Sequence, residues 1–74
     1  MSQQPSPIRL LRRPAVETIV GLKRSALYKM VADGRFPKPI SLSDGKNPPV
    51  AWLEHEVMAF VEQRIARRDL AGPQ

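Results

Sequence analysis

Residues 13–36 read RPAVETIVGLKRSALYKMVADGRF, and Gly21 and Gly34 divide this stretch into two short segments. Each segment carries apolar residues at helical spacing and ends near one of the glycines. Glycine commonly ends a helix because it adopts the left-handed backbone conformation at little cost. The pattern predicts one helix from Pro14 to Gly21 and a second from about Arg24 to Asp33, joined by a tight turn. Two short helices joined in this way are a helix-turn-helix candidate.

The same spacing predicts which faces of the two helices pack against each other and against a core. Pro14 suits the start of the first helix, because its ring fixes φ and its missing N–H would have no helical partner there. The residues expected on the packed faces are Val16, Ile19, Val20, Leu22, Leu27, Met30 and Val31.

The segments on either side of this pair complete a small α and β pattern. Residues 8–11 form an apolar patch that can be either a short strand or the lead-in to the first helix. Residues 36–39 read as an extended link, because each X-Pro pair disfavours helix at its first residue. Residues 40–42 and 50–52 read as the two strands of a hairpin around Asp44-Gly45, with a loose tip because Pro48 and Pro49 cannot donate to a ladder.

A last helix is expected from about Leu53. Acidic residues come early in it and arginines late, which matches the helix dipole. Trp52 and Phe60 read as core residues rather than as stacking platforms. The apolar stripe that should pack this helix comprises Leu53, Val57, Phe60, Val61 and Ile65.

The expected fold is therefore mainly α with a small β-hairpin, a winged helix-turn-helix of three helices plus a wing. We expect a flexible N-terminal arm over residues 1–8, the folded domain over residues 9–69 and a C-terminal tail over residues 70–74. A chain of 74 residues has room for one small domain.

Positive charge is concentrated in the part of the chain that carries the helix-turn-helix. The formal net charge is +5, and up to Val50 nine Lys and Arg residues stand against three acids. From Ala51 onward, three arginines stand against four acids. A basic front on a balanced C-terminal helix is typical of nucleic-acid-binding proteins.

Other function classes find little support in the sequence. Cysteine is absent, which excludes a cysteine-ligated metal site, and no cysteine or second histidine joins His55 as a nucleophile or ligand. No nucleotide-binding motif occurs. We therefore expect no enzyme and no cofactor. No apolar run has the length of a membrane span, and a cysteine-free chain suits the cytoplasm.

The outward side of the second helix is the strongest candidate site. Arg and Lys can donate to guanine or phosphate in the major groove, and Tyr28 can donate to phosphate or contact a base with its ring. Ser25 can donate to phosphate, or it can cap the helix by accepting a hydrogen bond from a backbone N–H. The recognition residues expected there are Lys23, Arg24, Ser25, Tyr28 and Lys29. On the wing, Lys46 could meet phosphate and Asn47 a minor-groove edge, although a solvated turn explains them equally well. Further backbone contacts are expected from Arg12, Arg13, Arg35 and Lys38.

From Arg9 to Arg68 the chain resembles the AlpA family of phage and mobile-element regulators, which are similar to winged-helix excisionases and MerR-type DNA-binding domains. The matching motifs are Gly21-Leu22, Arg24-Ser25, Leu27-Tyr28, the run Gly34-Arg35-Phe36-Pro37-Lys38-Pro39, and Ala51-Trp52. The resemblance places Arg24, Ser25, Tyr28 and Lys29 on a recognition helix and Lys46 on a wing. Two departures are Lys23, where the family often has a capping serine, and Pro48-Pro49 in the wing.

The resemblance implies binding of double-stranded DNA near attachment sites or promoters. An excisionase, or recombination directionality factor, and a transcription regulator would use the same surface, so both remain open. Excision is favoured, because 74 residues show no sensor or activation domain. Expected partners are DNA, further copies of the chain side by side on it, and a site-specific recombinase. The alternative is a protein-interaction module whose basic face binds an acidic partner such as a recombinase.

Overall fold

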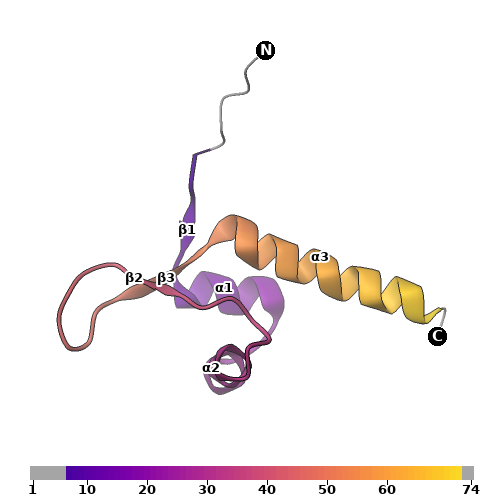
Figure 1. Cartoon of the computed structure of the whole chain (residues 1–74), viewed down its shortest axis with the longest axis horizontal. Helices are drawn as coiled ribbons and strands as arrows, with labels where there is room; N and C mark the ends of the chain where they lie inside the picture. The colour runs from indigo at the N-terminus through magenta and orange to yellow at the C-terminus, as the bar shows by residue number, and fades with distance from the viewer. Residues whose placement is uncertain (1–6, 73–74) are drawn as a thin grey trace, which may run out of the picture.

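The computed structural model describes residues 7–72, which form three helices and three short strands (Figure 1). In chain order the elements are β1 (Leu10–Leu11), α1 (Arg13–Val20), α2 (Arg24–Ala32), β2 (Ile40–Ser41), β3 (Val50–Leu53) and α3 (Glu54–Ala71). The winged helix-turn-helix expected from the sequence is confirmed. Most of the expected N-terminal arm and the last two residues of the expected tail lie outside the described residues.

Glycines end both helices of the helix-turn-helix, as their positions predict. Gly21 has a φ of 74°, and its N–H donates to the carbonyl oxygen of Glu17 at 2.8 Å. Gly34 has a φ of 76°, and the N–H of Arg35 beyond it donates to the carbonyl oxygen of Met30 at 2.8 Å. The second arrangement is a Schellman motif, which satisfies carbonyls that the helix end would otherwise leave unpaired.

The start of α2 differs from one expectation. Lys23 is the N-cap residue, in extended conformation, and no side-chain hydrogen bond caps the helix. Ser25 was expected to be able to cap, but it lies one residue inside the helix, where its hydroxyl is past the capping position. The candidate cap at Ser25 is therefore wrong, and Lys23 precedes α2 rather than lying on it.

The strands form one antiparallel sheet with β3 in the centre, in the order β1-β3-β2. Leu10 pairs with Leu53 on one edge, and Ile40 pairs with Ala51 on the other. The apolar patch before α1 thus contains a short strand, β1, and is not merely the lead-in to the first helix. Residues 42–49 form the wing loop between β2 and β3, and the N–H of Leu42 donates to the carbonyl oxygen of Pro49 at its base.

The core lies where the two short helices meet the sheet and the start of α3. It comprises Val16, Leu27, Phe36, Trp52 and Val57, all buried. Trp52 is fully buried and Phe60 packs against the cluster, so both are core residues as expected. Phe36 was read as part of an extended link, but its ring lies 4.7 Å from that of Phe60, centroid to centroid, in an edge-on contact.

Two residues expected on packed faces are exposed instead. Ile19 on α1 is 39% exposed and Ile65 on α3 is 44% exposed. The reason for Ile65 is the length of α3, which extends past α1 and α2 (Figure 1). Residues 62–71 are all exposed, so the second half of this helix packs only loosely against the rest of the described chain.

Candidate nucleic-acid interface

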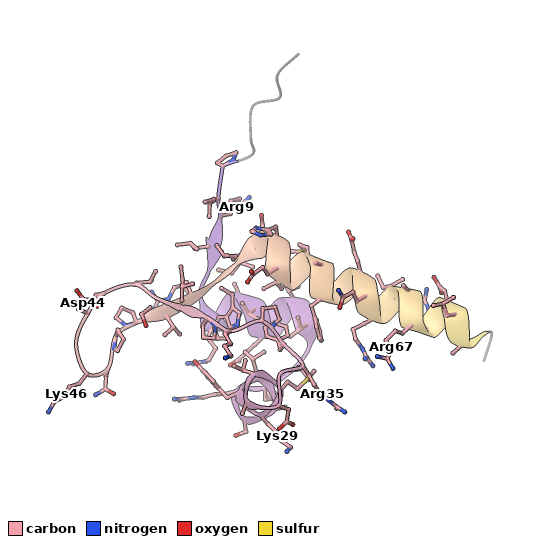
Figure 2. The ribbon with its side chains drawn as sticks, in the orientation of Figure 1. Arg9, Lys29, Arg35, Asp44, Lys46 and Arg67 are labelled. Atoms are coloured by element: carbon pink, nitrogen blue, oxygen red, sulfur yellow. The ribbon has the colours of Figure 1, made fainter. Side chains whose placement is uncertain are left out.

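Ser25 and Lys29 lie on the exposed side of α2 opposite the buried Leu27, and Arg24 is exposed at the first position of the helix. α2 contains no acidic residue. In Figure 2 the side chain of Lys29 points away from the body of the protein. This surface offers ammonium, guanidinium and hydroxyl donors from a single convex helix, which is the form that enters a major groove.

The two basic residues of this surface, Arg24 and Lys29, differ in whether a neighbouring side chain pairs with them. Lys29 Nζ lies 3.6 Å from Asp33 Oδ2 one turn later, and both side chains are largely exposed. Such an exposed pair is worth little, so a phosphate or a base edge can replace the carboxylate at small cost. Within residues 7–72, no ion pair or side-chain hydrogen bond involves Arg24. Its donors are therefore open to a ligand.

Tyr28 does not project freely from α2 as expected. It is half-buried and packs against the core, with its ring centroid 6.0 Å from that of Trp52. The helical turn brings position 28 close to the packed face, one step from Leu27. Tyr28 thus belongs partly to the core, and a DNA contact by its hydroxyl stays a prediction.

A hollow of about 360 Å³ separates α2 from the base of the wing. It brings together three residues predicted to contact DNA, Arg12, Arg13 and Tyr28. Its other lining residues are Pro14, Pro48, Pro49 and Val50. The sequence alone did not indicate that these arginines, which precede α2 by a whole helix, share a site with Tyr28.

Both arginines of the hollow are held in place by the fold. Arg12 Nε donates to the carbonyl oxygen of Val50 at 3.0 Å, which ties the start of α1 to β3. Arg13 Nε donates to Glu17 Oε2 at 2.9 Å within α1. Each guanidinium has further N–H groups for a second acceptor. The two arginines can therefore keep these contacts while binding phosphate.

The wing presents Lys46 and Asn47 on an exposed loop. In Figure 2, Lys46 points outward from the loop on the same side of the view as Lys29, while Arg9 lies on the opposite side. This arrangement is compatible with a contact between the wing and the DNA beside α2. The backbone around Gly45 has a φ of 125°, a conformation that favours glycine in this loop.

Arg35 and Lys38 do not join Arg12 and Arg13 in the hollow. Arg35 lines a different groove, between the helix-turn-helix and α3, and Lys38 is exposed on the link to β2. That link is held by Trp52, whose Nε1 donates to the carbonyl oxygen of Pro37 at 2.8 Å. The phosphate contacts expected of Arg35 and Lys38 stay predictions.

Three residues near these surfaces were not predicted from the sequence. Ala26 is exposed on α2 next to Ser25, and its side chain is small. Helical spacing from Leu27 does not distinguish it from Tyr28, because both lie about 100° from Leu27 and only Ala26 is exposed. Arg64 and Arg67 line the groove with Arg35, although their positions suggested only a favourable charge at a helix end.

Two further structural findings concern residues 7–72. No helix there is both long and apolar enough to cross a bilayer. In the same part of the chain, no three His, Cys, Asp or Glu residues are grouped so as to hold a metal ion.

Comparison with known proteins gives two matches. Residues 9–65 match the family model described as prophage CP4-57 regulatory protein (AlpA). The uncharacterized protein ORF88 of Enterobacteria phage P4 is 48% identical over 60 residues, which cover 81% of this chain and 65% of that protein. The chain thus aligns with somewhat less than two thirds of this phage relative. No solved structure matches the chain.

Proposed function

The chain belongs to the AlpA family of prophage regulatory proteins, and from this premise we propose that it binds double-stranded DNA with α2 in the major groove. The observation that carries the proposal is the exposed, acid-free side of α2 with Arg24, Ser25 and Lys29. Arg24 and Lys29 are the base-reading residues, and Ser25 donates to a phosphate.

Backbone contacts on both sides of α2 would orient the protein on the duplex. Arg12 and Arg13 reach a phosphate from the hollow beside α2, where the fold already holds their side chains. Lys46 reaches a second phosphate from the wing. Because pre-ordered side chains lose little conformational entropy on binding, the tethered arginines are well suited to this role.

The regulatory outcome that we propose is control of recombination, as an excisionase that acts on attachment-site DNA, with promoter control as the second outcome of the same binding. Both outcomes require a protein that recognises a DNA site and changes which other proteins assemble on that DNA. A single small domain makes few contacts, so several copies bound near one another would add affinity.

The first experiment measures binding to a random duplex as a function of salt. If the basic surface contacts phosphates, the logarithm of the binding constant falls linearly with the logarithm of salt, by about 0.9 for each phosphate neutralised. The absence of duplex binding even at low salt would contradict the proposal and favour an acidic protein partner.

Footprinting on the DNA that flanks the protein's own gene then separates the two outcomes. Protection at a recombination site, together with excision of a test element that depends on the protein, supports the excisionase role. Protection confined to a promoter, with a change in transcript level and no effect on excision, contradicts that role and supports transcription control.

A further inference from the structure

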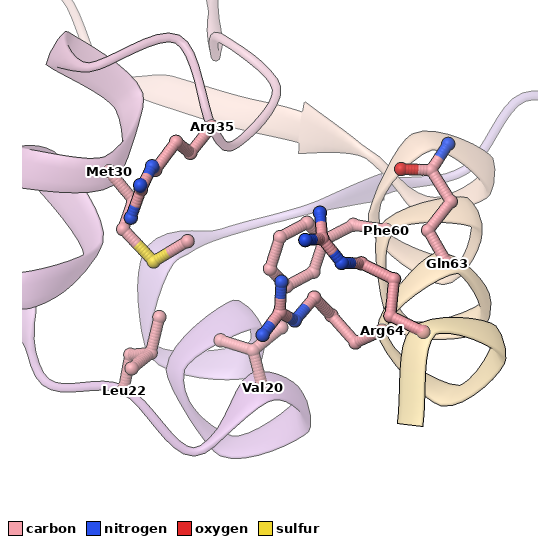
Figure 3. A pocket seen from close by; sticks show the side chains of 8 residues that line it. Val20, Leu22, Met30, Arg35, Phe60, Gln63 and Arg64 are labelled. Atoms are coloured by element: carbon pink, nitrogen blue, oxygen red, sulfur yellow. The ribbon is translucent and has the colours of Figure 1, made fainter. Parts of the chain in front are cut away.

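The protein has a groove on the side away from the wing, and the function proposed above does not use it. It lies between the helix-turn-helix and α3, has a volume of about 790 Å³ and is shown in Figure 3. The apolar side chains that line it are Val20, Leu22, Met30 and Phe60, and the polar ones are Arg35, Gln63, Arg64 and Arg67. An apolar surface of this kind, rimmed by polar groups, is typical of a protein-binding groove.

The groove concentrates positive charge that nothing in the described chain neutralises. The ion pairs of residues 7–72 engage Arg9, Arg13, Lys29 and Arg68. None of them reaches Arg35, Arg64 or Arg67, and no acidic side chain lines the groove. Three guanidinium groups around one apolar surface repel each other, so an occupant that carries both carboxylates and apolar side chains is the best match.

A surface of that composition lies on the opposite side of α3. Met58, Glu62, Ile65 and Asp69 follow one another at spacings of four, three and four residues, which places them in one stripe on a helix. All four are exposed, and Asp69 also pairs with the adjacent Arg68 at 2.9 Å through Oδ1, an exposed contact that a second partner can replace at small cost. The stripe alternates apolar and acidic side chains, and at about 100° per residue its centre is about half a turn from that of the groove residues of α3.

We propose that the groove of one copy binds the stripe of α3 from a second copy, with Met58 and Ile65 against the apolar surface and Glu62 and Asp69 against the arginines. Because groove and stripe lie on opposite sides of α3, the contact is heterologous, and it leaves one free groove and one free stripe at the ends of every pair. Such contacts build rings or open rows of copies rather than two-fold symmetric dimers.

The contact would also account for the length of α3. An isolated helix of this size is only marginally stable in water, and most helices are stabilised by packing of one face. The second half of α3 packs against little else in the described chain. A neighbouring copy on each side would cover both the groove and the stripe of this half.

The test measures self-association without DNA, so its outcome is independent of the proposed DNA binding. Sedimentation of the full chain is followed at low salt into the millimolar range, for Arg64→Glu, Glu62→Arg and the double variant that carries both changes. Each single change places like charges against each other across the contact, and we expect the association constant to fall more than about tenfold. The double variant exchanges the two charges, so a carboxylate at position 64 of one copy would face a guanidinium at position 62 of the next, and association should return.

Arg9→Glu is the matched control, because it makes the same charge change on the segment before β1, away from groove and stripe. Its association constant should stay close to that of the unaltered chain. Circular dichroism checks that each variant keeps its helix content, as expected for exposed positions. A monomer at every concentration, equal association of Arg64→Glu and the unaltered chain, or a double variant as weak as the single ones would each overturn the proposal. An Arg64→Glu variant that loses DNA affinity but not self-association would overturn it too, and would show that the groove binds phosphate instead.

Discussion

The indole nitrogen of Trp52 donates a hydrogen bond of 2.8 Å to the carbonyl oxygen of Pro37. This bond joins the central strand to the link that follows α2, and the same ring packs on Phe36 and Tyr28. A single side chain therefore positions α2 relative to the sheet that carries the wing.

Trp52→Ala should lower the free energy of unfolding by about 3–5 kcal/mol, because it removes a fully buried aromatic side chain. Trp52→Phe keeps most of the apolar volume and removes the donor to Pro37, so its cost should be smaller, about 1–3 kcal/mol. Urea unfolding followed by circular dichroism measures both. Equal losses for the two variants would show that the hydrogen bond, rather than packing, dominates.

Arg24→Ala and Lys29→Ala should each weaken binding to the specific DNA site by about 1–3 kcal/mol, the usual worth of a base-reading contact. The thermal unfolding midpoint should change little, since both side chains are exposed and the pair of Lys29 with Asp33 is weak. Arg9→Ala is the control with the same loss of charge on the opposite side of the protein. If all three variants lose the same affinity, α2 does not read the site.

Two substitutions at Tyr28 separate its packing against the core from its predicted contact with DNA. Tyr28→Phe keeps the ring on Trp52, so stability should hold, while DNA affinity falls if the hydroxyl donates to a phosphate. Tyr28→Ala should lower stability as well, because the half-buried ring packs against the core. Unfolding curves and DNA titrations are measured on the same samples. Unchanged DNA affinity in Tyr28→Phe would assign this residue to packing alone.

Lys46→Ala tests the wing through its salt dependence rather than through affinity alone. If Lys46 neutralises one phosphate, its removal should reduce the salt slope of binding by about 0.9 on random and specific duplexes alike. Asp44→Ala in the same loop provides a comparison that removes the opposite charge. If the salt dependence of binding is the same for Lys46→Ala as for the unaltered chain, Lys46 contacts no phosphate and the wing is a solvated turn.

Gly21→Ala should cost about 1 kcal/mol of stability, since alanine disfavours the left-handed conformation at a φ of 74°. A methyl group at this position would meet no atom within 4 Å, so the cost is conformational and not steric. Gly34→Asn should be tolerated better than Gly34→Ala, because asparagine enters this conformation more readily. Thermal unfolding ranks the variants, and no loss for Gly21→Ala would mean that the turn rearranges.

Local patterns were enough to predict much of this fold. Gly21 and Gly34 mark the ends of two helices because few other residues adopt a positive φ. The exposed position of Lys29 follows from helical spacing around Leu27, and the burial of Trp52 follows from its place between apolar residues. Arg24 is only about 60° from Leu27 on the helix, and it is exposed because it is the first residue of α2. The spacing of apolar residues did not predict the burial of Phe36. This residue lies in no helix or strand, and it is buried because the chain folds back over Trp52.

The sequence by itself determined the two glycine-ended helices, the basic side of α2 and the family, because each depends on neighbours within a few residues. Only the tertiary structure decided that the ring of Tyr28 packs against Trp52 and that Arg12 and Arg13 line a hollow together with Tyr28. It also decided that Arg35, Arg64 and Arg67 line one groove. These relationships join residues that are far apart along the chain. Their formation depends on how helices and strands pack, and packing is a property of the whole chain rather than of any local segment.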